Sequence, residues 1–578
     1  MEKHQDIDPF KLEIVRNSLV ATGDEMFHTI ARTAMSPIIY EVLDYATGLT
    51  DSKGKLITQG NGVTLFIGML SSMVKRTIDK FGDDLHPGDI IVINDPYVGG
   101  GSHLSDVGLV MPIFYDDQLI GFSANKAHWV DVGGKDPGSF TNDATEIFQE
   151  GLQLPCVKLF EKGKENTGIK EIINYNIRFP ELSIGDLWAQ VSALKTGENR
   201  VVELCDKYGH DVVTSSMNYL LEQGKSSTLK ELKEMPKGTF TAEDIIDTDG
   251  LGNGPLPIKV KVTVTDDEFI CDFRGSHQQV AGPVNCSYTG LVSAVRTVFL
   301  GITNPSQDLN DGAFSPLKII TDKASVFSAE KPAPVSVYFE SMNPAADLVW
   351  KALAPVLPER LTAGHLSSMC SLTLWGDHHM TNEPFLIVEP SFGGWGAGQT
   401  QDGARGLINI GDGETYNMPV EIAEFEYGVQ VEEYSFRADG AGAGKHNGGS
   451  GLIRSYKAMT DEQRVTASFG RHKSLPWGID DGQDGSPNEF YIRRSNGEME
   501  GPYGFKARCK LNKNDTVILK TGTGGGYGNP LEREKHKVLE DVLDGYVTLE
   551  QAKKDYGVIV DPVTLKIIDE TAERKQFR

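Results

Sequence analysis

Long apolar runs are missing from this sequence. No stretch reaches the roughly 18 apolar residues that a transmembrane helix needs. The N-terminal stretch MEKHQDIDPF contains no apolar core of the kind that a signal peptide carries. We therefore expect a protein that neither crosses nor enters a membrane and that works in the cytoplasm.

Cysteine is sparse, and basic residues are outnumbered by acidic ones. The six cysteines are scattered and none forms a CxxC pair, so we expect reduced thiols and no thiolate metal site. There are 56 Lys and Arg residues against 81 Asp and Glu residues, for a formal net charge of −25. This balance disfavours nucleic acid as a partner, because phosphate binding relies on cationic side chains.

Several common catalytic motifs are also absent. The nearest approach to a phosphate-binding loop is 439-DGAGAGKH, in which Asp439 replaces the first glycine and His446 replaces Ser or Thr. There is no GxSxG elbow and no HExxH helix. No glycine loop is followed by the helix that a dinucleotide fingerprint requires. We therefore expect no nucleotide site in this chain.

Glycine, by contrast, is abundant: there are 63 glycines in 578 residues, many of them in loops. The chain is too long for a single core. We expect an α+β protein of several lobes, with mixed sheets, helical insertions and a Gly-rich antiparallel β C-terminal region. The expected division is an N-terminal lobe with a helical excursion (1–235), a middle α/β lobe (236–390), and a Gly-rich β lobe with a helical tail (391–578).

Apolar periodicity predicts helices over Pro9–Thr33 and Ile67–Phe81, and a mainly helical stretch over 146–224. The first helix is expected to end before Ser36-Pro37, because the residue ahead of a proline resists the α conformation. The stretch 87-PGDIIVIND predicts a buried strand that leads into the most informative part of the chain.

That part, 94-NDPYVGGGSHLSDVGLVMPIFYDDQLIGFSANKAHWVDVGG, predicts a β-hairpin whose two apolar runs flank Asp116-Asp117-Gln118. A turn centred near Asp117 sets Asp106 opposite His128 and His103 opposite Asp131, and opposed Cβ atoms lie only about 5 Å apart. Two His and two Asp residues would then converge at the open end of the hairpin. Zn and Mn bind imidazole nitrogens and carboxylate oxygens in such clusters. A Lewis-acidic ion there favours hydrolysis as the chemistry.

A plainer interpretation competes with this one. A His and an Asp at strand ends often form only a solvated hydrogen-bonded pair, and a register slip of one residue would turn the side chains to the other face. His103 and Asp106 are three residues apart, so a regular strand would aim them at opposite faces. The site therefore requires an irregular backbone at this point.

Other candidate ligands are weaker. Asp44, on the preceding segment, is either a further carboxylate for the hairpin site or an ordinary surface acid. His365 and the pair His378-His379 are poorer candidates, since neighbouring residues of a strand point to opposite faces.

Several segments together resemble a known family. They are 94-NDPYVGGGSHLSDVGLVMPIF, 125-NKAHWVDVGG, 393-GGWGA with 417-NMPVEIAE, 432-EEYSFRADGAGAGKHNGGSG, and 524-GGGYGNPLERE with 555-DYGVIVD. Over nearly its full length the chain resembles the hydantoinase B family. That family includes the B-type subunits of ATP-dependent hydantoinases, the C-terminal half of 5-oxoprolinase, caprolactamase, and the acetone and acetophenone carboxylases.

The resemblance implies a single divalent ion, Zn or Mn. Its expected ligands are Asp44, His103, Asp106 and His128. The last three are also the expected catalytic residues. We expect Asp131 to orient His128 or His103 from behind, and Asp95 to act similarly.

The resemblance also implies an ATP-dependent hydrolase of cyclic amides of the lactam, hydantoin or oxoproline type. ATP and Mg would be used by a separate A-type (hydantoinase A-like) subunit, in a heteromer such as an α2β2 heterotetramer, and the chain would be active only with that partner. The partner would phosphorylate the substrate carbonyl, and a metal-bound water would open the ring. Tyr40 and Val42 stand where many relatives have arginines, which favours an apolar substrate such as a plain lactam.

Two other functions stay open. The alternative within the same family is a subunit of an ATP-dependent ketone carboxylase of the acetone or acetophenone type, which would depend on bicarbonate. The other is a structural subunit without catalysis, in which case replacing His103 would leave activity intact.

Overall fold

The computed structural model describes residues 8–303 and 309–577. Residues 1–7, which carry most of the stretch on which we predicted the absence of a signal peptide, lie outside the described residues. The chain forms two compact units, each built from segments that are distant in sequence. The first unit comprises Met1–Thr241, Lys259–Ala346 and Ile410–Met418, and the second comprises Ala242–Ile258, Asp347–Asn409 and Pro419–Arg578.

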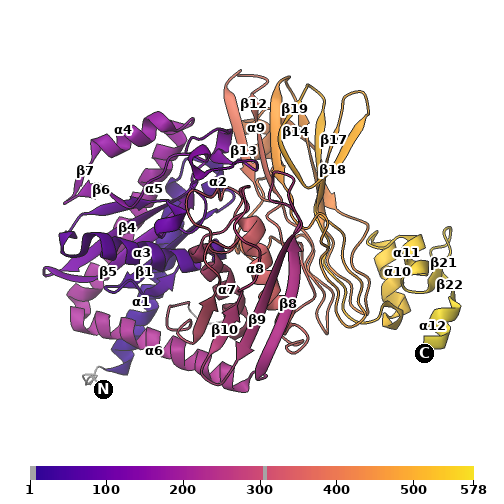
Figure 1. Ribbon diagram of the computed structural model, residues 1–578, viewed down its shortest axis with the longest axis horizontal. Helices are drawn as coiled ribbons and strands as arrows, with labels where there is room; N and C mark the ends of the chain where they lie inside the picture. Colours follow the sequence, from indigo (N-terminus) through magenta and orange to yellow (C-terminus); the bar gives the residue numbers. More distant parts are fainter. Residues whose placement is uncertain (1–7, 304–308, 578) are drawn as a thin grey trace. The chain divides into compact units, whose positions relative to one another are not determined.

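The first unit is built on a seven-stranded sheet in the order β2-β1-β5-β4-β3-β6-β7 (Figure 1). All of its pairings are antiparallel. The strands are β1 Tyr45–Asp51, β2 Leu56–Gln59, β3 Ile90–Ile93, β4 Asp106–Tyr115, β5 Gln118–His128, β6 Val157–Glu161 and β7 Lys164–Glu165.

The two central strands are covered on both faces. On one face Phe122 and Ala124 of β5 join a buried apolar cluster with Met73 of helix α3 (Ile67–Phe81). On the other face Asn125 donates to the backbone of Gln190 in helix α5 (Pro180–Tyr208). Since side chains alternate along a strand, α3 and α5 lie on opposite faces. Because both faces of these strands are buried, successive residues of β4 and β5 are apolar, which gives the nearly continuous apolar runs in the sequence.

The predicted hairpin is confirmed, and its register is instructive. Asp116 and Asp117 have φ angles of 47° and 60°, so the turn has two left-handed residues, as in a two-residue hairpin loop. Its centre falls between these two aspartates rather than on Asp117. A β-bulge between Ile113 and Phe114 shifts the pairing back by one residue, so that Asp106 is paired with His128 as predicted.

The helices predicted over Pro9–Thr33 and Ile67–Phe81 are confirmed with those bounds as α1 and α3. The stretch 146–224, predicted as mainly helical, instead contains β6 and β7, and its α-helices begin only at Thr167. The helices are α1 Pro9–Thr33, α2 Pro37–Tyr40, α4 Thr167–Asn176, α6 His210–Glu234, α7 Tyr288–Thr303, α8 Phe339–Leu353, α9 Val420–Glu426, α10 Lys535–Leu543, α11 Leu549–Lys554 and α12 Ala572–Phe577, besides α3 and α5. Among the described residues, none of them combines the length and the apolar character that spanning a bilayer requires.

A four-stranded mixed sheet follows, in the order β11-β10-β9-β8. Its strands are β8 Gly238–Ile246, β9 Leu256–Val264, β10 Phe269–Asp272 and β11 Leu317–Ile320. The β10–β11 pairing is parallel, whereas β9 and β10 are antiparallel. The predicted α+β class with mixed sheets is therefore confirmed.

The second unit has two larger antiparallel sheets, as expected for the Gly-rich C-terminal region. They run in the orders β13-β12-β16-β19 and β14-β15-β20-β17-β18. Their strands are β12 Ser371–Asp377, β13 Pro384–Glu389, β14 Val429–Phe436, β15 Leu452–Ala458, β16 Gln463–Ser468, β17 Glu489–Arg493, β18 Met499–Tyr503, β19 Phe505–Leu511 and β20 Thr516–Lys520.

The Gly-rich segments of this unit run as near-parallel traces between these strands and the C-terminal helices (Figure 1). Their backbones touch: a Cβ atom added to Gly524 would lie 1.9 Å from the Trp395 carbonyl oxygen. Glycine is therefore required here for close packing of one backbone on another.

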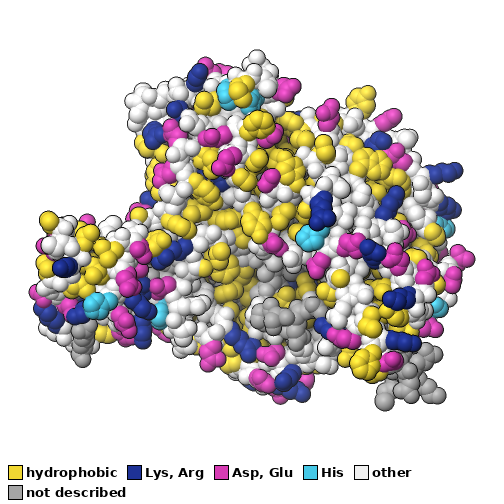
Figure 2. All heavy atoms as spheres, turned by 180° about the vertical axis from the view of Figure 1, so that it is seen from behind, with side chains coloured by type: hydrophobic (Ala, Val, Ile, Leu, Met, Phe, Trp, Pro, Cys, Tyr) yellow, Lys and Arg dark blue, Asp and Glu magenta, His cyan; other side chains and the backbone are white. Residues whose placement is uncertain are grey.

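A small C-terminal module closes the second unit. Helices α10 and α11 and the two-stranded sheet of β21 (Val558–Val560) and β22 (Ile567–Glu570) surround a core that includes Val538 and Tyr556. On the face shown in Figure 2, Lys and Arg side chains are scattered among Asp and Glu side chains over this module.

Candidate metal centre

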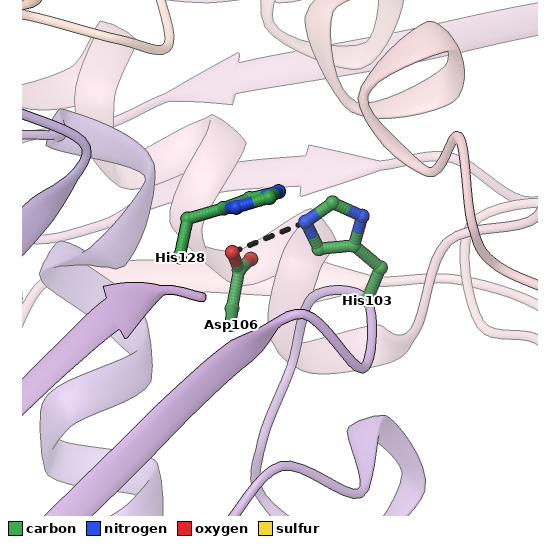
Figure 3. A group of neighbouring side chains, drawn as sticks. All are labelled: His103, Asp106 and His128. Carbon is green, nitrogen blue, oxygen red and sulfur yellow. Dashed lines mark hydrogen bonds and ion pairs between the residues drawn. The ribbon is translucent and has the colours of Figure 1, made fainter. Parts of the chain in front are cut away.

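Three of the predicted ligands converge at the open end of the β4–β5 hairpin. Asp106 is the first residue of β4, His128 is the last residue of β5, and His103 lies on the loop before β4 (Figure 3). One ligand atom from each of the three lies within 4.8 Å of the others. All three side chains are buried, with 5%, 1% and 4% exposure for His103, Asp106 and His128.

The loop before β4 brings His103 to the same side as Asp106. The Asp106 N–H donates to the His103 carbonyl in a turn (3.3 Å), so the extended strand begins only at Asp106. The preceding glycines let this loop pack tightly. A Cβ atom on Gly100 would lie 2.6 Å from the Asp95 carbonyl, and Gly101 has a φ of 84°. The irregular backbone that the spacing requires is therefore present.

The ring nitrogens of His103 face two acceptors. Nδ1 lies 3.0 Å from the Ser336 carbonyl, which can only accept, so Nδ1 carries a proton. Nε2 lies 3.1 Å from Asp106 Oδ1. In neutral His103 the Nε2 lone pair would therefore face a carboxylate oxygen, and only a proton or a metal cation between them relieves that contact. The pair fits the donor geometry of a metal site.

His128 has a buried nitrogen without a partner. Its Nδ1 makes no hydrogen bond within the part of the chain that the structure describes. Burial and the neighbouring His103 lower the pKa of His128 to about 4. The imidazole is therefore neutral at physiological pH, which is the form that binds metals.

Asp106 is held in its charged form. Burial raises the pKa of this carboxyl group, but the imidazoles of His103 and His128 and the ammonium of Lys126 outweigh burial and keep the pKa below its usual range. Lys126 is fully buried and donates to the Asp106 carbonyl oxygen (2.8 Å). The Tyr338 hydroxyl lies 3.5 Å from Asp106 Oδ2.

Asp44 lies beside this group without being one of its closest members. Its carbonyl oxygen accepts from the His128 N–H (3.0 Å), but its carboxylate is not among the atoms within 4.8 Å of one another. Burial, with the charges of Asp106 and Asp412, raises the pKa of Asp44 well above its usual value. A divalent cation would relieve this repulsion between carboxylates.

Asp412 was missed by the sequence argument. It is buried and close enough to Asp44 to influence its ionisation. The signal that the sequence offered was the glycine on each side of it, Gly411 and Gly413. In the structure Gly413 has a φ of 60°, and the Gly411 carbonyl accepts from Leu65 N at 2.8 Å.

The supporting roles of Asp131 and Asp95 stay predictions, and the structure shows which contacts the two carboxylates make. Asp131 accepts from the backbones of Gly133 and Gly138 and from Arg178, whose guanidinium lies 2.9 Å away. Asp95 accepts from the Tyr97 N–H and pairs with Lys331. Because β5 ends at His128, the ladder does not continue to place Asp131 opposite His103. Both aspartates therefore hold loops in place through these contacts.

A glutamine that the sequence argument did not consider holds the end of the hairpin. The Gln190 amide donates to Val107 O (2.9 Å) and to Asn125 Oδ1 (3.0 Å), and its oxygen accepts from the Trp129 indole (2.9 Å). Gln190 therefore ties β4, β5 and the residue after His128 to helix α5. This network fixes the strand ends that carry Asp106 and His128.

Two buried imidazoles and a buried carboxylate, with Asp44 beside them, form a suitable donor set for a divalent ion such as Zn or Mn. Of the other proposed specificity positions, Val42 is fully buried and Tyr40 is partly exposed on α2. Val42 therefore has no surface to present to a substrate.

Comparison with known proteins gives consistent matches. The family model described as "Hydantoinase B/oxoprolinase" matches residues 8–530. The putative B-type subunit of a D-/L-hydantoinase from Pseudomonas sp. (strain NS671) is 34% identical over 575 residues, covering 96% of this chain and 95% of that protein.

Two solved structures share the fold. The crystal structure of ATP-dependent caprolactamase from Pseudomonas jessenii matches with a TM-score of 0.90 and 29% identity, over 96% of this chain and 97% of the other. A nucleotide-free structure of acetone carboxylase matches with a TM-score of 0.91 over 98% of this chain and 82% of the other. Its identity is 18%, so this second match supports the fold alone.

Proposed function

Because the chain belongs to the hydantoinase B/oxoprolinase family, we propose that it is the metal-bearing subunit of an ATP-dependent cyclic amide hydrolase. The observation that carries this proposal is the convergence of the imidazoles of His103 and His128 with the carboxylate of Asp106 at the end of the β4–β5 hairpin. The names of the similar hydantoinase and caprolactamase support the cyclic amide as substrate class.

In this proposal His103, Asp106 and His128 hold the ion, Zn or Mn, and Asp44 joins them from the adjacent segment. The bound ion would supply Lewis acidity, which polarises a carbonyl group and lowers the pKa of water. The surrounding residues hold the centre in place. Lys126 anchors the Asp106 backbone, and the Phe339 ring lies 6.3 Å from the His103 ring.

We assign ATP to a partner, an A-type subunit in an α2β2 heterotetramer that phosphorylates the substrate carbonyl. In the best candidate phosphate loop of this chain, 439–446, several backbone N–H groups already donate to other parts of the chain. Gly442 N donates to Gly524 O (3.0 Å) and His446 N to Tyr527 O (3.0 Å). A phosphate cradle needs such N–H groups free to point at the ligand. The similar hydantoinase protein is itself named as one subunit of its enzyme.

Phosphorylation of the carbonyl oxygen turns a poor leaving group into a good one, and an unstrained cyclic amide needs this help because it hydrolyses slowly. In this scheme the substrate is a lactam, a hydantoin or an oxoproline-type ring. The substitution of Tyr40 for a family arginine favours the uncharged members of that set.

The test is reconstitution with the A-type partner and a panel of lactams, hydantoins and oxoproline. We expect ring opening that requires ATP and both subunits, and its loss in His103→Ala. Turnover only with a ketone and bicarbonate would instead identify a carboxylase subunit. Full activity of His103→Ala would identify a structural subunit.

A further inference from the structure

Glu150 is a buried carboxyl group outside the metal centre. It follows the short 3-10 helix Ile147–Gln149 and is 1% exposed. Its Oε1 atom accepts two adjacent backbone N–H groups, from Val335 (2.7 Å) and Ser336 (2.8 Å). Its Oε2 atom makes no hydrogen bond among the described residues.

The peptide that Glu150 holds is the one that contacts His103. The Ser336 carbonyl accepts from His103 Nδ1 (3.0 Å). The Ser336 side chain is held as well, since its Oγ accepts from the Thr141 N–H (2.9 Å) and donates to the Ser139 carbonyl (3.3 Å). The N–H, carbonyl and hydroxyl groups of Ser336 are therefore all engaged, and Glu150 supplies the acceptor for the N–H.

The position of the Ser336 carbonyl decides which nitrogen of His103 can bind a metal. A proton fixed on Nδ1 leaves the lone pair on Nε2, the nitrogen that faces Asp106. Metal-bound histidines commonly donate their other ring N–H to a backbone carbonyl or carboxylate, which fixes the tautomer and the ring orientation. Loss of the carbonyl contact would let the ring rotate and the proton move to Nε2.

We infer that Glu150 is a positioning residue for the metal centre. By holding the Val335 and Ser336 N–H groups, it fixes the Ser336 carbonyl and thereby keeps Nε2 of His103 free for the ion. This inference rests on the proposed function, because it assumes that His103 is a metal ligand.

Glutamine is the conservative replacement that tests the role of Glu150. Burial raises the pKa of this carboxyl group to about 8, so at neutral pH it is mostly the uncharged acid. Glutamine has the same shape, no charge and a carbonyl oxygen that can accept both N–H groups. Alanine provides no acceptor, and aspartate is one methylene too short to reach both.

A second buried carboxylate serves as a matched control. Asp89 is fully buried and accepts the His86 N–H (3.0 Å) and the Lys162 N–H (2.7 Å). It precedes β3 at the end opposite Ile93, which pairs with Gly108 near the metal centre. Asp89 also pairs with Lys158 (3.1 Å). Asp89→Ala therefore removes a buried anchor at least as extensive as that of Glu150 without touching the His103 contact.

The experiment measures Zn²⁺ affinity of the full chain by competition with a chromophoric chelator, with thermal unfolding recorded for each variant. We expect Glu150→Ala to bind Zn²⁺ roughly 10- to 100-fold more weakly than wild type, in the range found for partners behind metal ligands. Glu150→Gln should stay within about threefold of wild type, and Glu150→Asp should fall between, which keeps the test usable if the alanine variant does not fold. Asp89→Ala should lose stability but keep wild-type affinity.

Equal affinity in wild type and Glu150→Ala, or a loss in Glu150→Gln as large as in Glu150→Ala, would overturn the inference while leaving the metal site intact. A weakened Asp89→Ala that matches Glu150→Ala would also overturn it, because the effect would then be general destabilisation. Wild-type protein that binds no Zn²⁺ or Mn²⁺ would contradict the proposed function itself, and this inference with it.

Discussion

Two buried clusters in this protein combine aspartate with histidine, one in each unit, and they differ in their cations. In the first unit Asp106 faces the imidazoles of His103 and His128. In the second unit the Asp347 carboxylate is paired with the Arg471 guanidinium, accepts from the Trp477 indole (3.0 Å), and lies 3.5 Å from His365 Nδ1.

The second cluster carries its own permanent cation. Arg471 also pairs with Asp244 (3.0 Å), which Lys351 contacts as well (3.3 Å). The charge of Asp347 is therefore balanced by a residue that stays protonated. A divalent ion beside His365 would be repelled by that guanidinium. His365 Nε2, like His128 Nδ1, is buried without a partner among the described residues. Under the proposed function, we expect an unpartnered ring nitrogen to bind a metal only where no guanidinium already neutralises the neighbouring carboxylate.

The largest effect is expected from removing the cation of the second cluster. Arg471→Met would leave Asp347 buried without its cationic partner, whereas Asp244 keeps its contact with Lys351 (3.3 Å). Losing one partner of a buried pair costs about 3–5 kcal/mol. Urea unfolding of the variant would measure this loss, and Arg471→Met combined with Asp347→Leu should recover part of it. A loss below about 1 kcal/mol would mean that the pair is not stabilising as described.

Ligand-linked stability should distinguish the two clusters. Excess Zn²⁺ at about 100 times its Kd should stabilise the wild type by about 2.7 kcal/mol, because the ion binds only the folded site. His128→Ala should lack this increment and His365→Ala should keep it, as read from unfolding midpoints with and without the ion. Loss of the Zn²⁺-dependent stabilisation in His365→Ala would instead place the ion in the second cluster, beside Asp347, and contradict the account.

Acid should weaken the second cluster in a defined window. Burial raises the pKa of Asp347, but Arg471 and His365 outweigh it and hold the pKa at about 2, below the ordinary 3.8. The native state then binds fewer protons than the unfolded state between these values, so this stability is complete above about pH 4 and is lost as the pH falls toward 2. The contribution is about 2 kcal/mol.

This acid effect is measured by comparing unfolding free energies of wild type and Asp347→Asn between pH 5 and pH 2. The wild type should lose more stability across the window than the variant, since the variant has no carboxylate to protonate. Parallel curves would contradict a lowered pKa at Asp347.

The smallest effect concerns the hairpin that carries the first cluster. Asp117 has a φ of 60°, so Asp117→Gly would produce the Asp-Gly pair that this turn favours. Relief of the left-handed strain, about 1–2 kcal/mol, should exceed the extra entropy that glycine loses on folding, about 0.5–1 kcal/mol. We therefore expect a gain of up to about 1 kcal/mol in unfolding free energy, with unchanged metal content because the register is already set. A drop in metal content would show that the turn, rather than the bulge at Ile113, controls the register.

The sequence was most informative where interactions are local. Alternating apolar runs and the Asp116-Asp117 turn were sufficient to predict the hairpin and the Asp106–His128 pairing. The predicted turn centre was off by half a residue, and the bulge compensated for the error. The predicted pairing of His103 with Asp131 is absent from the ladder, because β4 begins at Asp106 and β5 ends at His128. The Asp131 carboxylate instead accepts a hydrogen bond from Arg178.

Interactions between distant segments could not be derived in the same way. Asp412 reaches the neighbourhood of Asp44 from a segment that follows several intervening elements, and no periodicity links the two. Ser336 and Glu150 likewise meet through loops without a regular pattern. The three-lobe division, with boundaries near 235 and 390, stays a prediction.

The most direct test of the central claim is metal content by elemental analysis of wild type, His128→Ala and His365→Ala, each purified in full length. The account predicts about one Zn or Mn per chain in the wild type and in His365→Ala, and almost none in His128→Ala. Metal retained by His128→Ala, or lost by His365→Ala, would contradict the assignment of the ion to the end of the β4–β5 hairpin.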